Sequence, residues 1–121
     1  MKRTRIKRHA PPDRLSPEER RHVLQRDGEC IARILARKKI VPPDECRNHF
    51  GDPIYVFTLA DLTYEHVKPH AAMGKRAPSA DGVGRRHGVA CCWAHNVNGW
   101  TSKNRAAIRD YLAALEQEGR L

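Results

Sequence analysis

Two short segments of this sequence each place a cysteine three residues before a histidine. They are Cys46 with His49 and Cys92 with His95, and Cys30 lies further upstream. One tight turn can present two ligands at this spacing to a zinc ion, which prefers four tetrahedral thiolate and imidazole ligands. We therefore predict a structural zinc site made of Cys30, Cys46, Cys92 and His95, with His49 as the alternative ligand.

The remaining cysteine, Cys91, directly precedes Cys92 in a stretch that has the pattern of a strand. Successive side chains of a strand point to opposite faces, so we expect Cys91 to point away from the zinc and into the core. Buried free cysteines also occur simply as small apolar residues. Zinc is favoured here because it can supply about 10–16 kcal/mol, against about 5–15 kcal/mol for the whole stability of a small domain.

Three polar residues close to these ligands have the chemistry for hydrolysing a phosphodiester bond. Glu65 and His66 are adjacent, and Asn96 directly follows His95. A histidine titrates near neutral pH and can take a proton from water, while a carboxylate can hold a divalent Lewis acid. Taken singly, they would be a surface carboxylate, an ordinary histidine and a turn residue. Only their combination favours a nuclease.

The elements that position these residues are short. Ser16, Pro17 and Glu19 have the pattern of a helix start, and Gly28 can end that helix in the left-handed conformation. Strands are predicted at residues 54–58, 62–67 and 88–91. Residues 31–40 read as irregular helix or loop, residues 73–86 as an exposed loop, and residues 106–115 as an amphipathic closing helix.

Length and composition set the scale of the fold. The chain has 121 residues, of which 40% are hydrophobic and only 6% aromatic, so it can build one domain with a modest core. We expect residues 15–121 to form a single small α+β domain with an N-terminal helix. Residues 1–14 form a basic arm, expected to be disordered in isolation, which serves either as a solubilising tail or as a phosphate contact.

The net charge of +9 points to a polyanionic partner: DNA, RNA or an anionic membrane surface. A membrane is disfavoured because no apolar run approaches the roughly 20 residues of a spanning helix. No apolar segment follows the basic start, so a signal peptide is not indicated and a cytoplasmic location is expected. Cysteines there are reduced, which favours metal ligation over disulfides.

The segments at residues 62–69 and 92–96 resemble the HNH endonucleases. That family has a ββα-metal motif, with two short antiparallel strands and a helix around one divalent cation. The loop at residues 73–79 is similar to the family's variable loop, and the Arg-Asp-Gly before Cys30 is similar to the usual approach to the first zinc cysteine. The resemblance covers about residues 16–115 and is strongest to small HNH proteins of phages infecting actinobacteria.

The resemblance implies a role for each matching residue. Glu65 takes the place of a cation ligand, His66 of the general base and Asn96 of the last cation ligand. The cation would be Mg²⁺, Mn²⁺ or Ni²⁺. The family also has an asparagine a few residues before its second zinc pair, and His87 stands there in this sequence. Histidine can donate a hydrogen bond in its place, or it marks a weakened site.

Clusters of basic residues bracket these motifs and are the candidate phosphate contacts: Lys75, Arg76, Arg85, Arg86, Lys103 and Arg105. Such contacts give affinity and salt dependence rather than sequence readout, so weak sequence preference is expected. The simpler alternative is a solvated basic face.

Together these patterns predict a metal-dependent endonuclease that hydrolyses or nicks DNA. By the phage resemblance, it would act in phage DNA processing or packaging in the host cytoplasm, beside a terminase. Two alternatives remain open: a zinc-containing DNA-binding protein without catalysis, and a terminase accessory protein.

Overall fold

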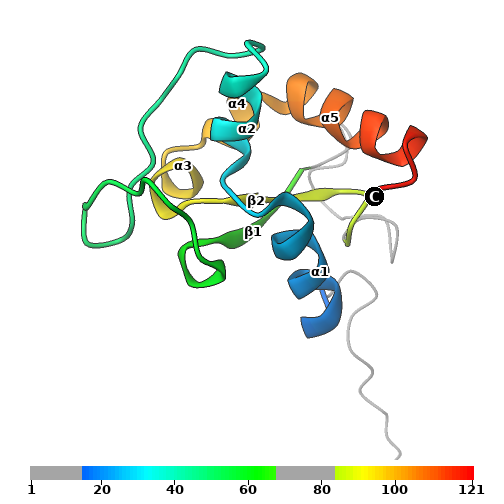
Figure 1. Cartoon of the computed structure of the whole chain (residues 1–121), viewed down its shortest axis with the longest axis horizontal. Helices are drawn as coiled ribbons and strands as arrows, with labels where there is room; N and C mark the ends of the chain where they lie inside the picture. Colours follow the sequence, from blue (N-terminus) through cyan, green and yellow to red (C-terminus); the bar gives the residue numbers. More distant parts are fainter. Residues whose placement is uncertain (1–14, 68–83) are drawn as a thin grey trace, which may run out of the picture.

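A two-stranded antiparallel sheet lies at the centre of the protein, seen here in a computed structural model that describes residues 15–67 and 84–121 (Figure 1). The predicted small α+β class is confirmed. The elements in chain order are α1 (Pro17–Asp27), α2 (Ile31–Arg37), the 3-10 helix η1 (Leu59–Asp61), β1 (Thr63–His66), β2 (Gly88–Cys91), α3 (Trp93–Val97), α4 (Trp100–Lys103) and α5 (Arg105–Gln117).

Helix α1 begins and ends where its capping residues predict. The Ser16 side chain accepts a hydrogen bond from the Glu19 N–H at 3.0 Å, and Pro17 occupies the first turn. Gly28 ends the helix with a φ of 72°, in the left-handed region that favours glycine. In Figure 1, α1 lies on one side of the sheet, with α2 and α5 on the other.

The sheet pairs Thr63 with Cys91, Glu65 with Val89 and His66 with Gly88. Both strands were predicted from their sequence. Gly88 is required because Tyr64 lies across it: a Cβ at Gly88 would come within 2.1 Å of the Tyr64 ring. This close approach fixes the end of β2 beside Glu65 and His66.

The strand predicted at residues 54–58 is wrong. These residues form no strand, and Tyr55 and Val56 are 77% and 83% exposed. The β-branched and aromatic pattern is present, but no strand within residues 15–67 and 84–121 pairs with it. Instead the Arg33 guanidinium donates to the carbonyls of Ile54 and Tyr55 and lies 4.6 Å from the centre of the Phe57 ring.

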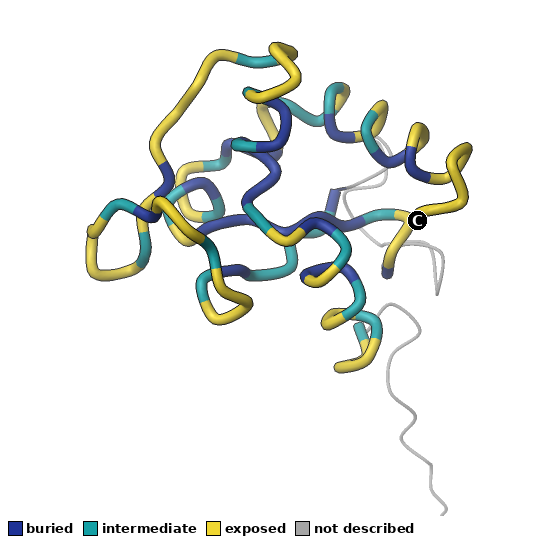
Figure 2. The backbone as a smooth tube through the Cα atoms, in the orientation of Figure 1, coloured by how far each residue is buried: buried dark blue, intermediate teal, exposed yellow. Residues whose placement is uncertain are grey.

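The main core lies between the sheet, α2 and α5, where the backbone is buried in Figure 2. Its fully buried members include Ile31, Leu35, Val89 and Ile108. The cysteines belong to this same cluster, so any metal site is built into the core.

One buried carboxylate ties three elements together. Asp27, at the end of α1, accepts hydrogen bonds from the Ala90 N–H at 2.8 Å and from the Tyr111 hydroxyl at 2.5 Å. Arg26 pairs with the same carboxylate at 2.9 Å. Because all of these partners are supplied, the buried charge is compensated, and it anchors α1 to β2 and α5.

Several sequence predictions lie outside the described residues: the basic arm at residues 1–14, most of the exposed loop at residues 73–86, and Lys75 and Arg76 within that loop. Among the helices described, none is long and apolar enough to cross a membrane.

Candidate metal centre and polar cleft

Four side chains from three separate segments converge in the core. Cys30 directly precedes α2, Cys46 lies in the loop after it, and Cys92 and His95 lie at and within α3. Their ligand atoms all lie within 4.8 Å of one another, and all four residues are buried. This is the ligand set predicted from the spacing, and it could hold a metal such as zinc.

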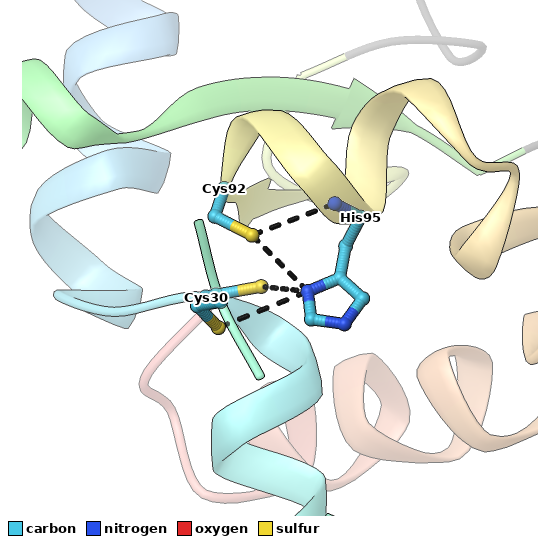
Figure 3. A group of neighbouring side chains, drawn as sticks. Cys30, Cys92 and His95 are labelled. Carbon is cyan, nitrogen blue, oxygen red and sulfur yellow. Dashed lines mark hydrogen bonds between the residues drawn. The ribbon is translucent and has the colours of Figure 1, made fainter. Parts of the chain in front are cut away.

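The distances in this cluster suit a tetrahedral site. The His95 Nδ1 atom lies 3.6 Å from the sulfur of Cys30, 3.7 Å from that of Cys46 and 3.1 Å from that of Cys92 (Figure 3). Zn–S and Zn–N bonds of about 2.3 and 2.0–2.1 Å place sulfur and nitrogen about 3.6 Å apart around a tetrahedral ion. Two of the three distances therefore match zinc geometry without rearrangement.

The other ring nitrogen of His95 is held by Asp44. Nε2 lies 3.1 Å from the Asp44 carboxylate, so in the neutral ring Nε2–H donates and Nδ1 keeps its lone pair for a metal. A carboxylate behind a metal-binding histidine fixes its tautomer and raises its basicity. The sequence analysis did not identify Asp44, which lies outside both cysteine–histidine pairs.

Neighbouring thiols favour ionisation of Cys30. Hydrogen bonds from Cys46, then Cys91 and Cys92, hold the pKa of Cys30 below its ordinary value. The same hydrogen bond with Cys30 is the main cause that raises the pKa of Cys46, so one thiol of the pair donates and the other is the thiolate, which is the form that binds a metal. The alternative ligand His49 is exposed, stacks on Phe50 at a ring separation of 4.0 Å, and is not part of the cluster.

Cys91 is buried in the core as expected, but it does not point away from the cluster. A hydrogen bond with Cys30 is the main cause that raises the pKa of the Cys91 thiol. Strand alternation fails here because β2 ends at Cys91 and the chain turns at Cys92 into α3. Cys91 therefore lies beside the four ligands without being one of them.

A second group of polar residues lies at the end of β1. Glu65 and His66 line a pocket of about 260 Å³ together with residues of α4 and the start of α5: Thr101, Ser102 and Arg105, with Val67 between. The strand end therefore brings both Glu65 and His66 to one pocket, as their chemistry requires. Burial raises the pKa of Glu65, and a hydrogen bond of 3.2 Å from the Thr101 hydroxyl acts against that rise.

Asn96 lies on the same side of the sheet as Glu65. Its Nδ2 atom donates to the Thr63 hydroxyl at 3.0 Å. Thr63 and Glu65 are two residues apart on β1, so their side chains share a face. Helix α3, which contains His95, thus carries Asn96 to the face of the strand that carries Glu65.

His66 contains an unusual atom. Its Nε2 is buried and has no hydrogen-bond partner in the described part of the chain. Buried polar atoms are nearly always paired, so an orphaned ring nitrogen suggests that water or a ligand completes its environment.

His87 lies near this pocket but not in it. Its carbonyl accepts a hydrogen bond of 2.7 Å from the Val67 N–H, which continues the sheet by one residue. His87 lines a neighbouring pocket with Arg86 and Arg109. His87, the residue expected to replace the family's asparagine, is therefore hydrogen-bonded to Val67, which lines the pocket of Glu65 and His66, but His87 does not line that pocket itself.

The basic residues predicted to contact DNA divide into two groups. Arg85 forms a two-point ion pair with Glu19, which lowers the pKa of Glu19 to about 2, and Arg86 pairs with Glu116 at 2.5 Å. Arg105 lines the polar pocket, and Lys103 is exposed at the end of α4. The guanidinium groups of Arg85 and Arg86 are thus already engaged within the protein.

Sequence analysis missed the two threonines that hold the polar residues, Thr63 and Thr101. A hint was available for Thr63, because strand alternation places it on the face of Glu65. No such signal exists for Thr101, which is distant in sequence.

No protein-family model, curated protein or solved structure matches this chain.

Proposed function

We propose that this protein is a metal-dependent endonuclease of the HNH type that hydrolyses or nicks DNA. The observation that carries the proposal is the unpartnered, buried Nε2 of His66, which shares a pocket with Glu65. A base and a carboxylate at one strand end, with an amide on the same face, form the minimal set for metal-assisted hydrolysis of a phosphodiester.

Glu65 and Asn96 would hold the catalytic cation. A carboxylate and an amide carbonyl are hard oxygen donors, which Mg²⁺ and Mn²⁺ prefer, so the donor set fits the proposed ion. When bound, that cation would act as a Lewis acid on the phosphate and stabilise the leaving oxygen. The softer thiolates of the core cluster suit zinc instead, so the two metal sites differ in ligand chemistry.

His66 would act as the general base. Its Nε2 accepts a proton from the attacking water, and no described group competes for that lone pair. The pKa of Glu65 is raised because the pocket is partly desolvated. In such a pocket, nearby dipoles would stabilise a charged intermediate more strongly than they would in water.

Two threonines orient the cation ligands. The Thr63 hydroxyl donates to the Cys91 carbonyl at 3.2 Å and accepts from Asn96 Nδ2. Because its NH₂ group is used in this way, the amide of Asn96 keeps Oδ1 available for the cation. The Thr101 hydroxyl binds one oxygen of Glu65 and leaves the other available.

The zinc cluster would support this site from behind. Asn96 follows His95 directly on α3, and Thr63 is tied to the carbonyl of Cys91, beside Cys92. A metal that fixes Cys92 and His95 would therefore also fix the position of Asn96. The sites would be coupled through one short helix.

The test is cleavage of supercoiled plasmid by zinc-loaded protein with Mg²⁺, Mn²⁺, Ni²⁺ or no added metal. Nicked and linear products should form only with an added divalent ion, and the activity should elute with the protein in size-exclusion chromatography. Folded, zinc-loaded protein that cleaves in none of these metals would contradict the proposal.

Thr63→Val tests the orienting role of the hydroxyl. We expect a reduction of cleavage by about 10- to 100-fold, as for other groups that orient metal ligands, because the Asn96 amide loses its acceptor. Mn²⁺ affinity, measured by calorimetry, should fall as well. Thr63→Ser keeps the hydroxyl and should retain most of both. Equal values in Thr63→Val and wild type would contradict this role.

A second candidate is a zinc-containing DNA-binding protein without catalysis. The position of His87 favours it, since this residue lines the neighbouring pocket instead of the one with Glu65 and His66. That function predicts DNA binding without cleavage in any metal. A role in phage DNA processing beside a terminase, or as a terminase accessory protein, is proposed on the resemblance alone.

A further inference from the structure

We infer that the face of α5 carrying the half-buried Arg105 and the exposed Arg109 is the surface along which the DNA backbone lies beside the polar pocket. This inference rests on the proposed function, and it replaces the expected contacts at Arg85 and Arg86. It assigns successive phosphates of one DNA strand to two arginines that the fold itself leaves unused.

Most of the described arginines are already engaged within the protein. Arginines at six positions pair with carboxylates of the protein: Arg26, Arg37, Arg47, Arg85, Arg86 and Arg120. Arg33 donates to backbone carbonyls. Among the residues described, Arg105 and Arg109 have no such partner, and neither do Arg20 and Arg21 on α1. Of these four, only Arg105 and Arg109 line the polar pocket or the pocket beside it, and Glu65 lines the same pocket as Arg105.

Fold stability does not account for their placement. Arg105 is the first residue of α5, and the first turn of this helix contains no acidic residue. Positive charge is unfavourable at a helix N-terminus, and like charges four residues apart repel each other. Lys103 adds a third cation two residues earlier, at the end of α4. A cluster of cations that is unfavourable in the free protein becomes favourable when an anion binds.

The pockets place this face next to the proposed chemistry. Arg105 lines the pocket of Glu65 and His66, and Arg109 lines the neighbouring pocket. Val67 belongs to both, so the two pockets adjoin. Four residues of a helix rise about 6 Å, similar to the separation of successive phosphates along a strand. One phosphate beside Arg105 and the next beside Arg109 would fit this spacing.

The test is the salt dependence of binding to duplex DNA, measured in a His66→Ala background so that the DNA stays intact. Each phosphate contact contributes about −0.9 to the slope of log affinity against log salt. We expect Arg105→Gln/Arg109→Gln to reduce the slope by about 2. Between 50 and 200 mM salt, the parent should therefore lose about tenfold more affinity than the double variant.

The matched control is Arg20→Gln/Arg21→Gln, which removes the same charge from the exposed surface of α1, across the sheet from α5 (Figure 1). Its slope should stay near that of the parent. An unchanged slope in the α5 variant, an equal drop in the α1 variant, or no measurable binding to DNA would overturn the inference. Because this experiment measures binding and not cleavage, it still tests the role of Arg105 and Arg109 if the protein proves not to be a nuclease.

Discussion

Replacing Cys92 by serine should unfold this protein at ordinary temperature. The Cys92 side chain is fully buried, lies 3.1 Å from His95 Nδ1, and caps α3 by accepting from the His95 N–H at 3.5 Å. A serine leaves three ligands and a buried hydroxyl without a metal bond. Structural zinc supplies about 10–16 kcal/mol in small peptides, more than a domain of this size holds in reserve.

The effect is expected to be global because the ligands join distant segments. Cys30 begins α2, Cys46 lies in the loop that follows, and Cys92 with His95 belongs to α3. The same cluster is part of the main hydrophobic core, together with residues of α5. Without a metal, the three buried thiols and His95 would lie close together with no ion to hold these segments in place.

Far-UV circular dichroism and elemental analysis measure this directly. Wild type should carry about one zinc per chain and lose helicity when a strong chelator removes it. Cys91→Ala is the matched control, since Cys91 is an equally buried cysteine outside the ligand set, and it should keep both zinc and fold. A folded, zinc-free Cys92→Ser protein would contradict a structural metal.

The ligand set was predictable because cysteine–histidine spacing is a local signal. Cys92 and His95 fit one turn, whatever the rest of the fold does. The choice between His49 and His95 was harder, because both pairs have the same spacing. Only the folded chain shows His49 exposed against Phe50, and only it brings Asp44 to His95.

The contrast between α1 and residues 54–58 shows that local sequence patterns predict helix ends better than they predict strands. The start of α1 is decided by Ser16 and Pro17 within a single turn, so it can be read locally. A strand needs a partner strand, and its residue types cannot supply one. Arg33, distant in sequence, binds the carbonyls of Ile54 and Tyr55 instead.

The polar site likewise combines residues that local motifs identify with contacts from distant parts of the chain. Glu65, His66 and Asn96 were identified from motifs, and the structure brings Glu65 and His66 to one pocket. Their supporting contacts are long-range, such as Thr101 with Glu65, and no spacing encodes them. The ion pair of Arg85 with Glu19 is likewise invisible in the sequence, which made Arg85 look available to DNA.

His66→Ala should lower the cleavage rate by about 10²- to 10⁴-fold, the usual contribution of a general base. The loss should fall on kcat more than on KM, because the base acts on the attacking water and the phosphate is held elsewhere. Plasmid nicking under single-turnover conditions, with saturating metal, measures the step directly. Zinc content and circular dichroism should stay unchanged, since His66 lies outside the cluster of Cys30, Cys46, Cys92 and His95.

His49→Ala is the matched control, because it removes an exposed histidine that lies in neither metal group. It should cleave at the wild-type rate. Added imidazole should partly restore cleavage by His66→Ala, since a small base can enter the space that the side chain leaves. A His66→Ala protein that cleaves as fast as wild type would show that the orphaned Nε2 has another purpose.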